Sequence, residues 1–235
     1  MDILIFGATG MVGQGVLREC LEAADVRRVA AVGRTPTDIA HPRLTNLVSP
    51  DLTDLRSVGA QLAPFDACFF CLGVSSVGMT EPDYTRITYD LTMSVARTLV
   101  RANPRMTFVY VTGAGTDSSE KGKSMWARVK GRTENALATL GFKATYMFRP
   151  GIIQPMHAVR SKTALYRAAY VLARPLFGVI RTFWPRSIVT SVEVGRAMLA
   201  VARSGYPRSI LEVADIQDAA RASTNMGSVD AQPLS

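Results

Sequence analysis

The chain has 235 residues, 48% hydrophobic and 20% charged, so it is long enough to bury the core of one α/β domain. It contains no stretch of eighteen uncharged apolar residues, which disfavours a membrane span, and an apolar strand that starts at residue 2 argues against a signal peptide. We therefore expect a cytoplasmic protein. Three cysteines and two histidines argue against a disulfide framework and a bound metal.

The chain opens with a strand, a glycine turn and a helix. Residues 3–6 form an unbroken apolar run, which is typical of a strand buried on both faces. Gly7, Gly10 and Gly13 follow at a spacing of three, and helical periodicity begins at residue 12. A turn without Cβ atoms lets a pyrophosphate approach the backbone, and the N–H groups of the helix start point at the anion. The pattern favours a dinucleotide site over a glycine turn without a ligand.

The second expected strand, residues 27–32, ends in Gly33-Arg34. A site that prefers NAD usually has an acidic residue here for the ribose 2′-hydroxyl, whereas an arginine suits the 2′-phosphate of NADP. A guanidinium binds phosphate through a fork of N–H groups. Arg34 therefore favours NADP(H) over NAD(H), and the alternative is a solvated surface arginine.

The rest of residues 1–151 alternates between strands and helices. Strands are expected at 44–48, 65–72, 106–111 and 144–148, and helices at 54–62, 81–102 and 124–140. Cys68 and Cys71 lie three apart in one expected strand, so their side chains point to opposite faces and are expected in the core. This order predicts an α/β fold, a doubly wound, mostly parallel Rossmann sheet with a ligand crevice at the carboxyl ends of its strands.

The C-terminal part has a different character. Residues 135–192 contain eight Lys and Arg residues and no Asp or Glu, which accounts for the net charge of +8. We interpret residues 152–190 as a small, basic and apolar helical segment on the substrate side of a single domain, residues 1–218. A helix at 191–203 and a short strand at 210–213 are expected to follow. Residues 219–235 are polar and lack aromatic residues, so we expect a disordered tail.

Three explanations of the basic segment stay open: a solvated arginine face, recognition of an anionic substrate, and weak association with an anionic membrane surface through residues 160–186. Nucleic acid is not expected as a partner, because no nucleic-acid-binding motif accompanies the charge.

A set of short motifs resembles one known family. The ordered set resembles the atypical, or extended-like, short-chain dehydrogenase/reductases of the NAD(P)-binding Rossmann type, and more narrowly their Tat-interacting-protein-like subgroup. The motifs are Gly7-Ala-Thr-Gly-Met-Val-Gly13, Gly33-Arg34, Asp51-Leu52, Cys71-Leu-Gly73, Val111-Thr112, Lys130-Gly131 and Arg149-Pro-Gly151. A weaker match at residues 191–198 extends the likeness to about residue 218.

The resemblance implies where a bound cofactor lies. The pyrophosphate would be held by Gly7, Thr9, Gly10, Met11, Val12 and Gly13, and the 2′-phosphate by Arg34. Asp51 and Leu52 would meet the adenine, Cys71, Leu72 and Gly73 would pass beside the ribose, and Pro150, Gly151 and Ile152 would border the nicotinamide.

The resemblance also implies a catalytic set and shows a departure from it. The family uses a tyrosine, a lysine four residues later on the same helix, and a serine or threonine after the fifth strand. Lys130 and Thr112 match the lysine and the threonine, but Trp126 stands at the tyrosine position. Because indole releases no proton at accessible pH, Trp126 is not expected to act as an acid or base.

Two functions therefore stay open. The first is an NADP(H)-dependent oxidoreductase that acts on a small carbonyl-type substrate, and the chain is expected to be an enzyme on this view. The second is a noncatalytic NADPH-binding sensor or regulatory module, which Trp126 favours.

Overall fold

A seven-stranded sheet forms the centre of the molecule. The computed structural model describes residues 1–56, 58–154 and 188–229. The sheet has the strand order β3-β2-β1-β4-β5-β6-β9, and all its pairings are parallel. Its strands are β1 (Asp2–Phe6), β2 (Arg28–Gly33), β3 (Leu44–Val48), β4 (Ala67–Phe70), β5 (Thr107–Val111), β6 (Ala144–Phe148) and β9 (Ile210–Leu211). The expected doubly wound α/β fold is confirmed.

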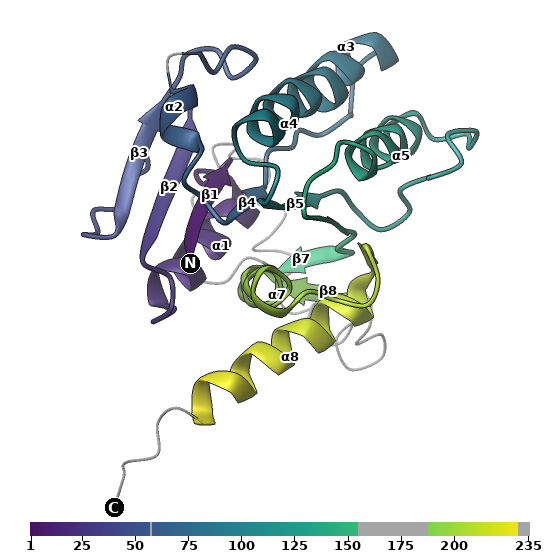
Figure 1. The fold of residues 1–235 in the computed structure, drawn as a ribbon. Helices are drawn as coiled ribbons and strands as arrows, with labels where there is room; N and C mark the ends of the chain where they lie inside the picture. Colours follow the sequence, from purple (N-terminus) through teal and green to yellow (C-terminus); the bar gives the residue numbers. More distant parts are fainter. Residues whose placement is uncertain (57, 155–187, 230–235) are drawn as a thin grey trace, which may run out of the picture.

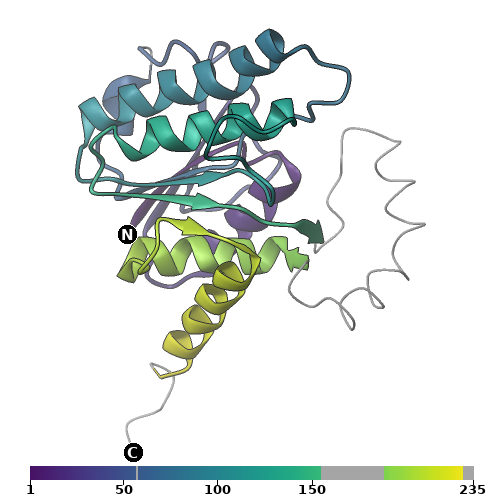
Figure 2. The same cartoon turned by 90° about the vertical axis from the view of Figure 1, so that its right-hand side faces the viewer.

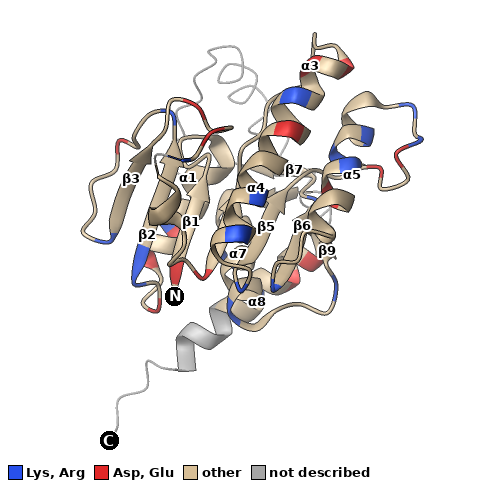
Figure 3. Ribbon diagram, turned by 45° about the horizontal axis from the view of Figure 1, so that its top comes forward, with Lys and Arg blue, Asp and Glu red and all other residues tan. Residues whose placement is uncertain are grey.

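Helices cover both faces of this sheet, as Figures 1 and 2 show. One face carries α2 (Gly59–Leu62), α4 (Leu91–Ala102) and α5 (Met125–Ala138), and the other α1 (Met11–Glu22), α7 (Ser191–Ser204) and α8 (Val213–Val229). Strand side chains alternate between the two layers: Ile3 and Ile5 pack in one, Leu4 and Phe6 in the other. Charged residues, blue and red on the ribbon of Figure 3, are found mainly on the helices and loops around the sheet.

The cysteines follow the expected alternation. Cys68 is buried in the layer of α4 and α5, whereas Cys71 packs against the layer of α1 and α7. Burial raises the pKa of the Cys71 thiol to about 12. Cys71 is therefore a partly buried side chain packed against the core, and a poor nucleophile near neutral pH.

Several helices differ from the expected ranges. Of the helix expected at 54–62, only Gly59–Leu62 forms, and Asp54 lies outside it, where its carboxylate accepts a hydrogen bond from the Arg56 N–H. The helix expected at 81–102 is divided into α3 (Glu81–Thr85), one π-helical turn η1 (Arg86–Asp90) and α4. Thr80 caps α3, and Pro82 lies in its first turn, where its missing N–H costs no helical hydrogen bond.

The C-terminal part departs most from expectation. Residues 219–229 continue α8 instead of forming a disordered tail, because Ile216, Ala219 and Ala220 are buried against the core, and the proposed boundary at residue 218 falls inside this helix. A second, two-stranded parallel sheet pairs β7 (Ile152–Gln154) with β8 (Ile188–Thr190). The basic segment at 160–186 and residues 230–235 of the expected tail lie outside the described residues. Within the part of the chain that the structure describes, no helix is long and apolar enough to cross a bilayer.

Candidate functional site

The glycine turn between β1 and α1 leaves no space for a Cβ atom at Gly7 or Gly13. Gly7 has a φ of +82°, and a Cβ there would lie 2.9 Å from the carbonyl carbon of Cys71. A Cβ at Gly13 would lie 2.1 Å from the carbonyl oxygen of Gly7. The turn is closed by the Gly10 N–H, which donates to the same oxygen at 2.9 Å. α1 therefore begins directly against the end of the central strand, with no acidic side chain in its first turn.

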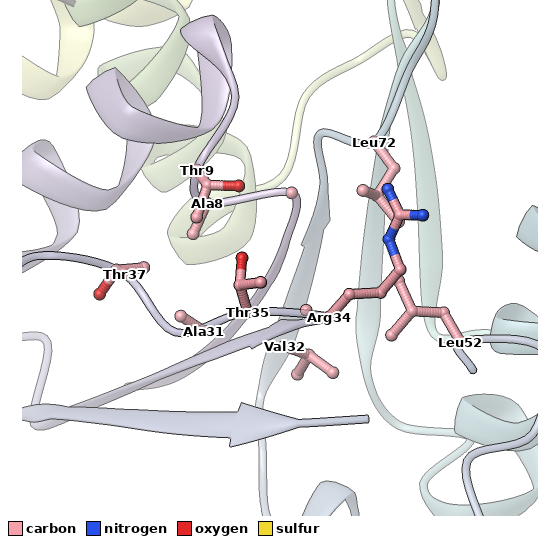
Figure 4. A pocket seen from close by; sticks show the side chains of 11 residues that line it. Ala8, Thr9, Ala31, Val32, Arg34, Thr35, Thr37, Leu52 and Leu72 are labelled. Atoms are coloured by element: carbon pink, nitrogen blue, oxygen red, sulfur yellow. The ribbon is translucent and has the colours of Figure 1, made fainter. Parts of the chain in front are cut away.

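A cavity of about 300 Å³ opens beside this turn at the carboxyl ends of β1 and β2. It is lined by Gly7, Ala8, Thr9, Ala31, Val32, Gly33, Arg34, Thr35, Thr37, Leu52 and Leu72. The exposed Arg34 side chain extends across it toward the side where Leu52 and Leu72 lie (Figure 4). The cavity thus joins glycine backbone, an apolar wall and one guanidinium, a set suited to a nucleotide with phosphate groups.

Two residues of this cavity are held by local hydrogen bonds. The side-chain oxygen of Asn46 on β3 accepts from the Thr37 N–H at 2.9 Å and from the Thr37 hydroxyl at 3.1 Å. Asp51 accepts from the N–H and hydroxyl of Thr53, which lowers the pKa of its carboxyl and fixes the turn that places Leu52. Asn46 is not among the site residues predicted from the sequence, because the residues around it form no recognisable binding motif.

The catalytic candidates Thr112 and Lys130 are in direct contact at the end of β5. Lys130 Nζ donates to the Thr112 carbonyl oxygen at 2.6 Å, which leaves two N–H bonds of the ammonium group for other partners. Burial lowers the pKa of Lys130 to about 8, and the nearby carboxylate of Glu134 opposes this lowering.

The Thr112 hydroxyl faces the protein interior. It is 2.7 Å from Glu134 Oε1 and 3.1 Å from the carbonyl oxygen of Phe148, and only 7% of the residue is exposed. Both neighbours are hydrogen-bond acceptors, so the single hydroxyl proton is directed at one of them. In this arrangement the hydroxyl has no proton to offer to a substrate oxygen.

Glu134 and Arg149 form a buried ion pair that no sequence motif indicated. Arg149 Nε donates to Glu134 Oε1 at 3.1 Å and its Nη2 to Oε2 at 2.5 Å. The same guanidinium reaches Ser118 at 2.5 Å and Glu212 at 3.2 Å. Arg149 thereby links α5 to the loop after β5 and to Glu212, the residue that directly follows β9. It directly precedes Pro150, whose carbonyl accepts from the Ala114 N–H at 2.8 Å.

Trp126 lies over the loop that follows β5. A Cβ at Gly113 would be 3.9 Å from Trp126 Cζ3, and one at Gly115 would be 3.8 Å from Cη2. The indole is partly exposed, one turn before Lys130 on α5. It therefore covers loop backbone beside the Thr112–Lys130 pair. Ile152, the first residue of β7, is 47% exposed.

Gly131 allows the loop after β5 to pack on α5. A Cβ at this position would lie 1.8 Å from the carbonyl oxygen of Asp117, which is backbone and has little freedom to move. We expect Gly131→Ala to lower the free energy of unfolding by about 1–3 kcal/mol, as overpacking does in other cores. Chemical denaturation would measure this. Gly59→Ala is the matched control, because a Cβ at Gly59 meets no atom within 4 Å; equal stability of both variants would contradict the packing described.

Comparisons with known proteins agree with this geometry. The family described as NAD(P)H-binding matches residues 7–155. The fmp52-1 protein of Aspergillus terreus, named as mitochondrial, is 32% identical over 162 residues, which cover 65% of this chain and 66% of that protein. HTATIP2 of Rattus norvegicus is 27% identical over 202 residues, covering 84% and 79%. The chain thus spans about two thirds of the fmp52-1 protein.

A solved structure has the same fold. The Bordetella bronchiseptica enzyme WbmF, crystallised with NAD⁺, superposes with a TM-score of 0.63 at 15% identity and covers 99% of this chain and 80% of its own. At this identity the likeness concerns the fold alone.

The comparisons correct one prediction and confirm another. The expected cytoplasmic location is wrong, since several fmp52 relatives are named as mitochondrial proteins; average composition does not separate these two compartments. The family resemblance, by contrast, is confirmed by the match that starts at Gly7 and extends past the end of β6. The chain belongs to the NAD(P)H-binding family, as a Rossmann-fold protein of the atypical short-chain dehydrogenase/reductase type.

Proposed function

We propose that the chain binds NADP(H) and is an oxidoreductase that acts on a small carbonyl-type substrate. The observation that carries the proposal is the cavity in which Arg34 joins the glycine turn at the ends of β1 and β2. A 2′-phosphate placed there would meet a guanidinium and no carboxylate among the lining residues, which favours NADP(H) over NAD(H).

Residues at the carboxyl ends of several strands fit such a cofactor. The turn can bring the start of α1 against the end of β1 only because Gly7 and Gly13 lack Cβ atoms, which would lie 2.9 and 2.1 Å from backbone atoms. The N–H groups at this helix start suit the phosphate groups of the cofactor. NADPH, when bound, supplies a hydride. Lys130 would donate its two remaining N–H bonds to the nicotinamide ribose, and Thr112 fixes the position of its ammonium group.

A second function is favoured by two observations. Trp126 stands where the family has its tyrosine, and the Thr112 hydroxyl proton is directed at Glu134 or Phe148. An NADPH-binding regulatory module without hydride chemistry would need neither proton donor. Both functions require cofactor binding, so they differ only in turnover.

The test is an NADPH fluorescence titration followed by a screen of carbonyl substrates. We expect wild type to bind NADPH and to turn over slowly, and Trp126→Tyr to raise the rate about tenfold or more, because a positioned acid contributes roughly 10²–10⁴-fold in other enzymes. The ring at position 126 already lies against the loop after β5, so a smaller ring fits there.

Trp126→Phe is the matched control, since it shrinks the ring without adding an acid. A gain in both variants would mean that space and not proton transfer limits the rate. Turnover in Trp126→Tyr alone, with none in wild type, would favour the regulatory module. No NADPH binding by folded wild type would refute both functions.

A further inference from the structure

Lys130 and Glu134, one helical turn apart on α5, both hold Thr112. Lys130 donates to its carbonyl oxygen at 2.6 Å, and Glu134 accepts from its hydroxyl at 2.7 Å. Residues four apart on a helix share one face, so this side of α5 is fixed against the carboxyl end of β5 at two points. The family roles given above for Lys130 and Thr112 include no role for Glu134.

Glu134 is buried and carries more than a packing role. Its side chain is 2% exposed, and its ion pair with Arg149 satisfies both carboxylate oxygens. A buried carboxylate destabilises the folded protein unless a positive charge is paired with it, and Arg149 supplies that charge. The paired Glu134 carboxylate can therefore stay ionised in the interior, near the ammonium group of Lys130. Arg149 also forms an ion pair with Glu212. Of these three charged groups, only the Glu134 carboxylate acts on the pKa of Lys130, which it raises against the effect of burial.

The consequence concerns the charge of the lysine. Burial alone favours a neutral amine, and a neutral Lys130 would lose the positive charge and one N–H donor. Its contact with the Thr112 carbonyl uses one donor in either state. A charged Lys130 keeps two further donors for hydroxyl groups, whereas a neutral one keeps a single donor.

We propose that Glu134 is a positioning residue of the cofactor site, which keeps Lys130 charged and fixes the strand end on which the lysine is held. This inference rests on the proposed function, because the ligand that Lys130 meets is taken to be the nicotinamide ribose. It adds a residue that is placed behind the lysine and touches no ligand itself.

The first experiment follows Lys130 directly and needs no ligand. The full chain is labelled with [ε-¹³C]lysine, which gives only five lysine signals, and the Lys130 signal is identified by its loss in Lys130→Arg. Wild type is expected to titrate near pH 8, where burial places the pKa of this lysine. In Glu134→Gln the midpoint should fall by roughly one pH unit, since an opposite charge near a titrating group shifts it by about that much or more.

The second experiment measures NADPH affinity from pH 6 to pH 9 by fluorescence. Binding that needs the charged lysine is strong below its pKa and weakens as the pH rises through it, so wild-type affinity should fall above about pH 8. In Glu134→Gln the fall should begin about one pH unit lower, with affinity at pH 6 within about threefold of wild type. A purely structural role would instead weaken binding equally at every pH.

Two variants complete the test. Glu22→Gln removes an exposed glutamate near the end of α1 and is expected to leave both midpoints unchanged. If Glu134→Gln fails to fold, Glu134→Asp takes its place in both experiments. The aspartate keeps a negative charge for Arg149 but holds it one methylene farther from Lys130. The midpoints of the lysine titration and of the NADPH binding curve should therefore lie at lower pH than in wild type. Unchanged Lys130 midpoints in the folded Glu134 variant would overturn the inference while leaving NADPH binding intact. Absence of NADPH binding in wild type would overturn the proposed function as well.

Discussion

Replacing Gly13 with alanine should weaken NADPH binding by at least ~100-fold, or about 2.7 kcal/mol at 25 °C. The new Cβ would lie 2.1 Å from the carbonyl oxygen of Gly7 and 2.7 Å from its carbonyl carbon. Gly7 has no room to retreat, because its own position is packed against the backbone of Cys71 and Leu72. The turn must therefore deform, and the N–H groups at the start of α1 lose their alignment with a pyrophosphate. A fluorescence titration of NADPH measures the loss.

Two further glycine variants control this result. Gly59→Ala should bind NADPH within about twofold of wild type, because a Cβ there meets no atom within 4 Å. Gly10→Ala should fall between the two, since its Cβ would lie 3.2 Å from the Gly7 oxygen and a small shift can relieve that contact. Circular dichroism establishes that each variant is folded. Wild-type affinity in folded Gly13→Ala would show that the phosphate site lies elsewhere.

The glycine turn was predictable because its causes are local. A buried strand, three glycines and a helix start occupy one short stretch, and each follows from neighbouring residues. The same holds for the alternation that puts Cys68 and Cys71 in different layers. The local patterns of strands and helices were therefore sufficient to predict the fold class, and the parallel sheet confirms that prediction.

The missed features depend on contacts between distant residues. A turn and a strand separate Glu134 from Arg149 in the sequence, and no local motif around either residue predicts their ion pair. α8 continues past residue 218 because small and apolar side chains meet the core there, whereas its composition alone suggested a tail. The expected helix at 54–62 formed only in its last turn, where Leu62 is buried. Tertiary packing decided each of these cases.

Arg34→Ala should lower NADPH affinity by roughly 10–100-fold and leave NADH affinity within about threefold, because hydrogen bonds to charged groups contribute about 1.5–3 kcal/mol. The side chain is exposed and lies on the wall of the cavity, so its removal creates no internal void. The two cofactors differ only in the 2′-phosphate, which makes the ratio of their affinities specific for this contact. Parallel titrations with NADPH and NADH measure that ratio.

A general effect of net charge must be separated from this contact. Arg105→Ala removes the same charge from an exposed position just before the amino end of β5, whereas the cavity lies at the carboxyl ends of the strands, and should leave the ratio unchanged. Arg34→Lys keeps the charge but loses the fork of N–H groups, so its ratio should lie between those of wild type and alanine. If the ratio in Arg34→Ala equals that of wild type, the preference for NADP(H) does not arise from this arginine. The threonines that share its cavity, Thr35 and Thr37, would then be the next residues to vary.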